Sequence, residues 1–222
     1  MKKSIIMVLS VCILAIMLTA CKTGGMMEYQ NKKDNPKIQV GEFKSPSSKL
    51  LLSLPEEMVV DKEPKFEPVA EAVKSYVSAK DSNLPESGVY NVKPKDDYYK
   101  FMINVQYACF DKDKIERETG QEFSFNLDEG VDAYVKDMKA RAENKSNNMK
   151  DLDINVTTIN IDGKDARSIN YSFKSKGYPV FGKMINIVDN DTVWGISFNG
   201  DGKDNDVPKE IDKIIETIRF SK

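Results

Sequence analysis

The chain has 222 residues, of which 40% are hydrophobic and 31% are charged, and its formal net charge at pH 7 is −2. This composition is enough for one folded core, and the length fits a short leader followed by one domain. A slightly acidic chain lacks the basic excess typical of nucleic-acid-binding proteins. We therefore expect no nucleic acid as a partner.

Histidine is absent from the sequence. Its absence excludes Ser-His-Asp and Cys-His catalysis, and it also excludes metal sites that need imidazole ligands. An enzyme with this composition would depend on carboxylates, lysine, tyrosine or a bound cofactor. No motif for such a cofactor is present, and we expect none.

The first residues have the pattern of a secretory leader. Lys2 and Lys3 precede an apolar run from Ile5 to Leu18, and small residues follow in Leu18-Thr19-Ala20-Cys21. The alternative is an uncleaved membrane-spanning helix, but the run is shorter than the roughly 20 residues that cross a bilayer. A cysteine directly after the small residues resembles a bacterial lipoprotein signal.

That resemblance implies that Cys21 becomes the lipidated first residue of the mature protein, with acyl chains such as palmitate. We expect a signal peptide in residues 1–20, a lipidated N-terminus and tether in 21–47, and a single domain in 48–222. The protein would then be held at a membrane in the cell envelope, facing the extracytoplasmic side. Cys109 would be the remaining thiol, and we expect it to be buried because it ends an alternating apolar face.

The N-terminal half of the domain contains alternating and helical patterns. Apolar residues in the expected tether indicate an edge strand, and a helical apolar face follows the first strand of the domain. The residues concerned are Ile38, Val40 and Phe43 for the edge strand, 49–55 for the first strand, Phe66 to Val77 for the helix, and 88–92 for an extended segment.

A strand over residues 99–109 has the strictest alternation in the chain, with polar residues on one face. This pattern predicts a sheet covered chiefly on one side. The next segment, 127–143, has an apolar helical stripe. Asn126 followed by Glu129 resembles a capping box at its start.

The C-terminal third predicts a series of antiparallel strands and a closing helix. The apolar positions shift by one residue between Val156 and Ile159, which indicates a bulge or two segments. Asp162-Gly163 is a strong hairpin signal. The expected elements are strands at 169–173, 181–188 and 194–198 and a helix at 207–218, capped by Asp206.

Together these elements predict an α+β fold, a largely antiparallel sheet of about six to seven strands flanked by amphipathic helices. Four short segments resemble the PsbP-like sandwich family, which includes the DcrB-like lipoproteins. They are Leu54-Pro55-Glu56-Glu57-Met58, Ile161-Asp162-Gly163-Lys164-Asp165-Ala166, Val193-Trp194-Gly195-Ile196-Ser197-Phe198 and Ile214-Ile215-Glu216-Thr217-Ile218-Arg219-Phe220. The resemblance implies accessory or partner-binding roles and no shared catalytic residues.

Three sets of residues are candidates for a site. Asp201, Asp204 and Asp206 are weak calcium candidates, and the competing interpretation is a solvated turn in which Asp206 caps the last helix. Tyr98 is a candidate contact residue, because one of two adjacent tyrosines must face away from the buried side. The aromatic residues around Trp194 form either a ligand cleft or the core, and we expect the core.

These observations favour a membrane-anchored, non-enzymatic accessory lipoprotein that binds a protein partner in the cell envelope. Two alternatives remain open at this point. One is a hydrolase or transferase that uses carboxylates or a cation, and the other is a small solute-binding lipoprotein.

Overall fold

The computed structural model describes residues 38–69, 71–79, 82–94, 101–144 and 149–221. Within these ranges no helix has both the length and the apolar character needed to cross a bilayer. The elements in chain order are β1 (Ile38–Lys44), β2 (Lys49–Pro55), β3 (Met58–Val60), β4 (Lys65–Phe66), the 3-10 helix η2 (Glu71–Tyr76), β5 (Ser87–Pro94), β6 (Phe101–Cys109), α2 (Lys112–Thr119), α3 (Leu127–Glu143), β7 (Met149–Ile161), β8 (Lys164–Ser175), β9 (Tyr178–Asp189), β10 (Thr192–Asp201), α4 (Val207–Ile215) and β11 (Arg219–Ser221).

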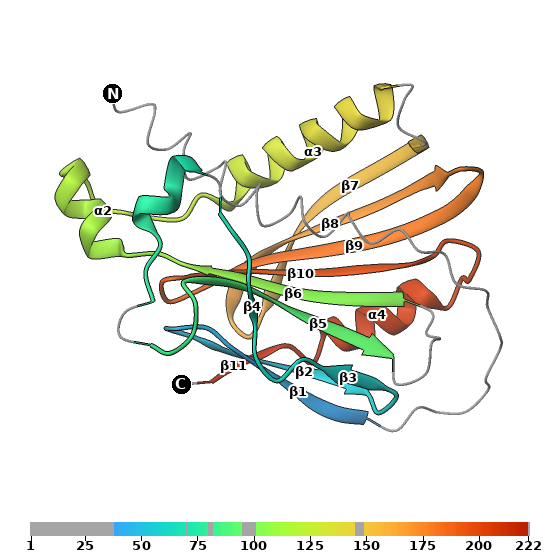
Figure 1. The fold of residues 1–222 in the computed structure, drawn as a ribbon. Helices are drawn as coiled ribbons and strands as arrows, with labels where there is room; N and C mark the ends of the chain where they lie inside the picture. Colours follow the sequence, from blue (N-terminus) through green and yellow to red (C-terminus); the bar gives the residue numbers. More distant parts are fainter. Residues whose placement is uncertain (1–37, 70, 80–81, 95–100, 145–148, 222) are drawn as a thin grey trace.

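The strands form two antiparallel sheets. The main sheet has eight strands in the order β3-β5-β6-β10-β9-β8-β7, with β4 paired to β5, and the small sheet has the order β1-β2-β11. Figure 1 shows α3 on one side of the main sheet and α4 with the small sheet on the other. The expected α+β class is confirmed, although the small sheet was not expected as a separate layer.

Two apolar clusters fill the spaces between these layers. One lies between the main sheet and the small sheet with α4, and it contains Trp194, Ile196 and Phe198 of β10. The other lies on the opposite face, where Val131, Tyr134 and Met138 of α3 pack over the sheet. The main sheet is therefore covered on both sides.

Coverage on both sides corrects the expectation for the strand that ends at Cys109. In β6 the polar residues Asn104 and Gln106 are only 6% and 5% exposed, so the polar face of the strand is buried as well. Strict alternation reports which side chains share a face, but the elements that cover a face come from distant parts of the chain. Cys109 itself is fully buried, as expected.

The shift of apolar positions in residues 154–161 also arises because the main sheet is covered on both sides. The structure has one continuous strand, β7, and its register irregularity lies earlier, between Lys150 and Asp153. Ile154 packs on the α3 side, whereas Ile159 and Ile161 pack in the cluster beneath the small sheet. The two halves of the strand thus bury opposite faces, and no bulge is needed at the shift.

The helix expected from Phe66 to Val77 is not formed as such. Residues 65–66 pair with β5 as β4, and a 3-10 helix covers only residues 71–76. Ser87 holds the intervening backbone, because its hydroxyl donates to Glu67 O and its carbonyl accepts from Glu67 N. These bonds give the backbone N–H and C=O of Glu67 hydrogen-bond partners in the sheet in place of the partners that a helix would provide.

The two ends of the described domain compare differently with expectation. At the N-terminal end, the edge strand expected from Ile38, Val40 and Phe43 is confirmed as β1, which is paired along its length with β2. The last helix ends at Ile215, and Arg219–Ser221 forms β11 on the other side of β2. Thr217 makes this change of direction, since its hydroxyl donates to Ile214 O and accepts from Ser53 N.

Two other local sequence signals predicted the structure correctly. α3 covers the predicted residues 127–143, and the Asn126 side chain accepts from the Glu129 N–H at its start. Asp162 and Gly163 both have positive φ, 51° and 78°, as a two-residue hairpin turn requires.

Candidate functional site

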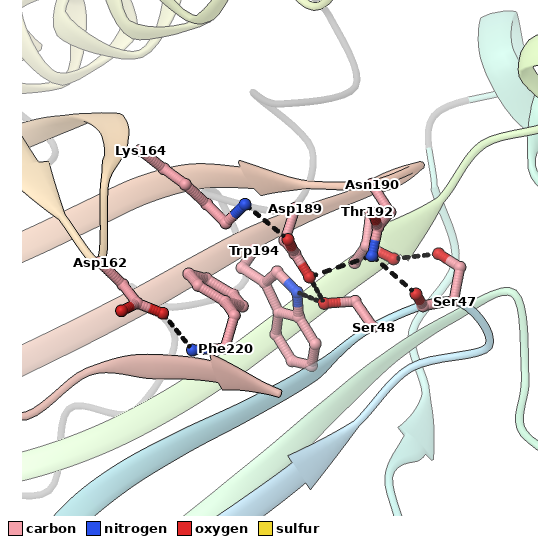
Figure 2. A network of polar contacts seen from close by, with 9 residues as sticks. All are labelled: Ser47, Ser48, Asp162, Lys164, Asp189, Asn190, Thr192, Trp194 and Phe220. Atoms are coloured by element: carbon pink, nitrogen blue, oxygen red, sulfur yellow. Dashed lines mark hydrogen bonds and ion pairs between the residues drawn. The ribbon is translucent and has the colours of Figure 1, made fainter. Parts of the chain in front are cut away.

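Polar side chains from three chain segments converge at one end of the strands, where turns of the two sheets contact each other. The segments are the turn between β1 and β2, the turn between β9 and β10, and the start of β8 (Figure 2). We call this set the edge network, and it consists of Ser45, Ser47, Ser48, Lys164, Asp189, Asn190, Thr192 and Trp194.

Asp189, at the end of β9, is the acidic centre of the edge network. It is only 6% exposed, and its carboxylate accepts hydrogen bonds from Ser48 Oγ and from Asn190 Nδ2, the latter at 3.3 Å. Lys164 Nζ lies 2.8 Å from the other carboxylate oxygen. A buried carboxylate requires such partners, because an unpaired one would pay a large desolvation cost.

Trp194 connects this centre to the core. Its indole N–H donates to Ser48 Oγ at 3.1 Å, and the side chain is fully buried against Tyr107, with ring centroids 5.4 Å apart. The expectation that Trp194 belongs to the core is confirmed. The surrounding aromatic residues divide between the two faces of the sheet, since Tyr171 and Phe173 pack on the α3 side.

Thr192 links the same turns by a second route. Its hydroxyl lies 2.9 Å from Ser45 Oγ and 2.8 Å from Ser47 Oγ. Ser47 Oγ is also 3.2 Å from the sulfur of Cys109, and Asn190 Nδ2 donates to Ser47 O at 3.1 Å. The serine-rich turn is therefore held at several points to the end of the main sheet.

A serine beside a carboxylate and a lysine raises the question of nucleophilic catalysis. An activated serine needs a base that takes its proton and an oxygen that a substrate can reach. Ser48 is 8% exposed, its oxygen already accepts the Trp194 N–H, and Asp189 is paired with Lys164. With this geometry Ser48 is better suited to joining the two sheets than to acting as a nucleophile on a substrate.

The C-terminal strand is fixed beside this network. Lys164 Nζ lies 5.6 Å from the centroid of the Phe220 ring, and the Phe220 N–H donates to Asp162 Oδ2 at 2.8 Å (Figure 2). β11 is thereby tied to the β7–β8 turn as well as to β2.

The residues proposed as calcium ligands lie around the loop that leads into α4. Asp201 Oδ1 accepts from the Lys203 N–H, Asp204 Oδ1 accepts from the Asp206 N–H, and Asp206 pairs with Lys209 at 3.4 Å. Asp206 occupies the N-cap position of α4 as expected, but its side chain accepts no backbone N–H of the helix, which corrects the expected capping bond. In the part of the chain that is described, no three acidic, cysteine or histidine side chains are placed to hold a metal.

A cleft of about 300 Å³ opens beside this loop. Its apolar wall includes Phe181, Pro179 and Pro208, and its rim includes Asp151 and Lys174, whose charged groups lie 2.7 Å apart. The hydrogen bond from Lys174 holds the pKa of Asp151 below its usual range, so this carboxylate is charged at neutral pH.

Two of the predicted site residues, Cys21 and Tyr98, lie outside the described residues. The edge network was not predicted. Ser45 and Ser47 fall within the expected tether of residues 21–47, and no site was expected at Ser48 or Asp189. The sequence signal that marks the network is a polar residue at the end of each of several apolar strands.

No protein-family model matches the chain, and no curated protein matches its sequence. Among solved structures, the cyanobacterial PsbP (CyanoP) of Synechocystis sp. PCC 6803 matches 89% of this chain and all of its own length, with a TM-score of 0.51 and 9% sequence identity. The fold is PsbP-like. At this identity the similarity establishes the fold and no more.

Further structures match at TM-scores below 0.5, and no argument rests on them. One is LpqN of Mycobacterium tuberculosis, described as involved in cell envelope biogenesis, with 14% identity over 83% of this chain and 92% of its own, and a TM-score of 0.37. Another is a Pseudomonas aeruginosa protein of unknown function described as a putative regulator, with 12% identity over 72% of this chain and 95% of its own, and a TM-score of 0.36.

Proposed function

We propose that this protein is a lipoprotein of the bacterial cell envelope, anchored through acyl chains on Cys21, and that its PsbP-like domain is a non-enzymatic accessory module for a protein partner. The observation that carries the proposal is the sequence Leu18-Thr19-Ala20-Cys21 after a basic and apolar leader. More than one acyl chain gives stable membrane attachment, which a single chain does not.

Two features of the domain support an accessory role. Its first described strand, β1, begins 17 residues after Cys21, so the fold starts close to the proposed anchor along the chain. The polar groups of the edge network are paired with one another in bonds that join the two sheets. The outer surfaces are thus left to make contacts with other molecules.

The anchoring part is tested by replacing the proposed lipid site. Cys21→Ala should release the protein from the membrane fraction and abolish incorporation of labelled palmitate. Cys12→Ala, a matched cysteine change within the leader, should leave both unchanged. Membrane association and palmitate incorporation that persist in Cys21→Ala would contradict the anchor.

The accessory part is tested by crosslinking in cells with the lipidated protein and with Cys21→Ala. A protein captured by the lipidated form and lost in the variant would place a partner interaction at the membrane. If both forms capture the same partner in equal amounts, partner binding does not depend on the anchor. A folded, anchored domain that captures no protein would contradict the accessory role.

A second candidate function is binding of a small solute in the cleft beside α4. The cleft volume of about 300 Å³ is at the lower end of the range of small-molecule sites. A ligand that fills it should raise the melting temperature, and Phe181→Ala should remove that rise. An unchanged rise in Phe181→Ala would place the ligand elsewhere.

A further inference from the structure

The small sheet has one face in the core and one face towards solvent. Burial alternates along β1 and β2, so that Phe43, Leu50, Leu52 and Leu54 enter the core. The side chains between them point outwards. We call this surface the outer face, and it is formed by Ile38, Val40, Glu42 and Lys44 of β1, Lys49, Leu51 and Ser53 of β2, and Arg219 of β11.

One end of the outer face is apolar. Ile38 and Val40 are 69% and 68% exposed, the largest exposures among the large hydrophobic residues of the described chain. They occupy alternate positions of an edge strand, so both side chains project from the same side. Placing two β-branched apolar side chains in water costs free energy that contact with an apolar surface would recover.

The other end of the outer face is basic. Lys44 and Lys49 lie 2.9 Å and 3.1 Å from the Glu42 carboxylate, and Arg219 is exposed on β11. The register places Glu42 opposite Leu51, and Leu51 opposite Arg219, so these groups share one row across the sheet. Three cations against one carboxylate make this face positive, although the whole chain carries a net charge of −2.

The outer face also lies at the start of the domain. Ile38 lies 17 positions after Cys21, and an extended chain covers at most roughly 60 Å over that stretch. A lipid on Cys21 would therefore keep the domain within that distance of the bilayer. The apolar pair is the part of the described domain nearest to the anchor along the chain.

We propose that the outer face rests on the anionic surface of the membrane to which Cys21 is attached. Ile38 and Val40 enter the interfacial region, and Lys44, Lys49 and Arg219 meet phosphate headgroups, to which basic side chains are attracted. The inference rests on the proposed lipid anchor and adds an orientation to it. α3 lies on the opposite side of the main sheet (Figure 1), so in this orientation it faces away from the membrane and is accessible to a partner.

The test uses the mature lipidated protein in vesicles of phosphatidylglycerol and phosphatidylcholine. A polarity-sensitive fluorophore is attached to Val40→Cys, and the matched control is Lys139→Cys on the exposed side of α3. Cys109 is fully buried, so the introduced cysteine is the site that reacts in the folded domain. Lipids with nitroxide headgroups should quench the label at Val40 several-fold more strongly than the label at Lys139.

Equal quenching at the two positions, or stronger quenching at Lys139, would overturn the proposed orientation. Flotation of the vesicles separates this result from failure of the anchor. Protein that fails to float contradicts lipidation, whereas protein that floats with Val40 unquenched contradicts only the inference about the outer face.

The electrostatic part is tested with the double variant Lys44→Gln and Lys49→Gln in the Val40→Cys background. The charge loss should reduce quenching at Val40 in the anionic vesicles. Vesicles of phosphatidylcholine alone should give a similarly reduced signal with the parent protein. If quenching at Val40 is the same in the double variant and in vesicles of phosphatidylcholine alone as in the parent protein on anionic vesicles, the role assigned to the basic end is wrong.

Discussion

Trp194 donates its indole N–H to Ser48 Oγ at 3.1 Å, and this bond joins β10 of the main sheet to the turn before β2 of the small sheet. Ser48 in turn donates to Asp189, which pairs with Lys164 of β8. One hydroxyl thus stands between the aromatic core and a buried charge. Loss of this hydroxyl would remove both the acceptor of the Trp194 N–H and a donor to the Asp189 carboxylate.

Ser48→Ala should therefore lower the free energy of unfolding by about 1–3 kcal/mol, the cost of leaving buried polar groups unpaired. Ser53→Ala is the matched control, because Ser53 is on the outer face of the same strand region, and its effect should stay within about 0.5 kcal/mol. Urea unfolding followed by circular dichroism measures both. Equal midpoints for the two variants would contradict the role of Ser48.

Trp194→Ala should lower the free energy of unfolding by about 3–5 kcal/mol, because it removes a fully buried indole from the core. Tyr178→Ala is the control, since Tyr178 is 50% exposed. Circular dichroism is the appropriate probe, because Trp194 is the only tryptophan and fluorescence is lost with it. An unchanged midpoint for Trp194→Ala would mean that the indole does not contribute to the core.

Gly182→Ala should be destabilising because the ring of Tyr171 covers this glycine from the neighbouring strand. A Cβ at position 182 would lie 2.1 Å from the ring, so the ring would have to move. Movement would also break the bond between Tyr171 Oη and Asn199 Oδ1, which are 2.6 Å apart. The expected loss is about 1–3 kcal/mol, typical of overpacking.

A double-mutant cycle checks this cause for Gly182→Ala. With Tyr171→Ala in the background, the ring that opposes the new methyl group is absent. Gly182→Ala should then cost much less, giving a coupling free energy between the two sites. Strict additivity of the two changes would show that contact with the ring is not the cause.

Stability should also fall at alkaline pH through Tyr90. Burial raises the pKa of this phenol above its ordinary value of about 10, although its bond to the Lys44 backbone acts in the opposite direction. The folded state thus holds the proton more tightly than the unfolded state. The stabilisation is fully present below pH of about 10 and is lost as the pH rises from there through the folded-state pKa.

Tyr90→Phe should remove part of this alkaline loss. The variant also loses the bond that the Tyr90 hydroxyl donates to Lys44 O at 2.8 Å, so it should be less stable than the parent at neutral pH. Unfolding midpoints measured from neutral pH to above pH 10 give both effects. A parent and variant with parallel profiles would show that Tyr90 does not carry the alkaline transition.

The elements that local patterns predicted well are those whose signals are also local. α3 has its stripe and its Asn126 cap within one segment, and the β7–β8 turn is set by Asp162 and Gly163, which tolerate positive φ. The alternation of Trp194, Ile196 and Phe198 identified the strand and correctly placed all three in the core.

The edge network was beyond such patterns, because its members come from turns far apart in the chain. Ser48 and Trp194 are 146 residues apart, and Ser48 and Asp189 are 141 apart. Each residue alone is an ordinary polar group beside a strand. Only the pairing of the sheets brings Ser48 between the indole and the carboxylate.

Local sequence patterns were enough to predict the α+β class and the positions of most strands, and they contain the leader on which the proposed anchor depends. Which faces of the sheet are buried depends instead on contacts between distant elements. Asn104 and Gln106 look solvent-facing in an alternating strand, yet both are buried, because segments from distant parts of the chain cover the main sheet on both sides. Periodicity depends on the geometry of one strand, whereas burial depends on contacts between elements, and those contacts form only when the whole chain has folded.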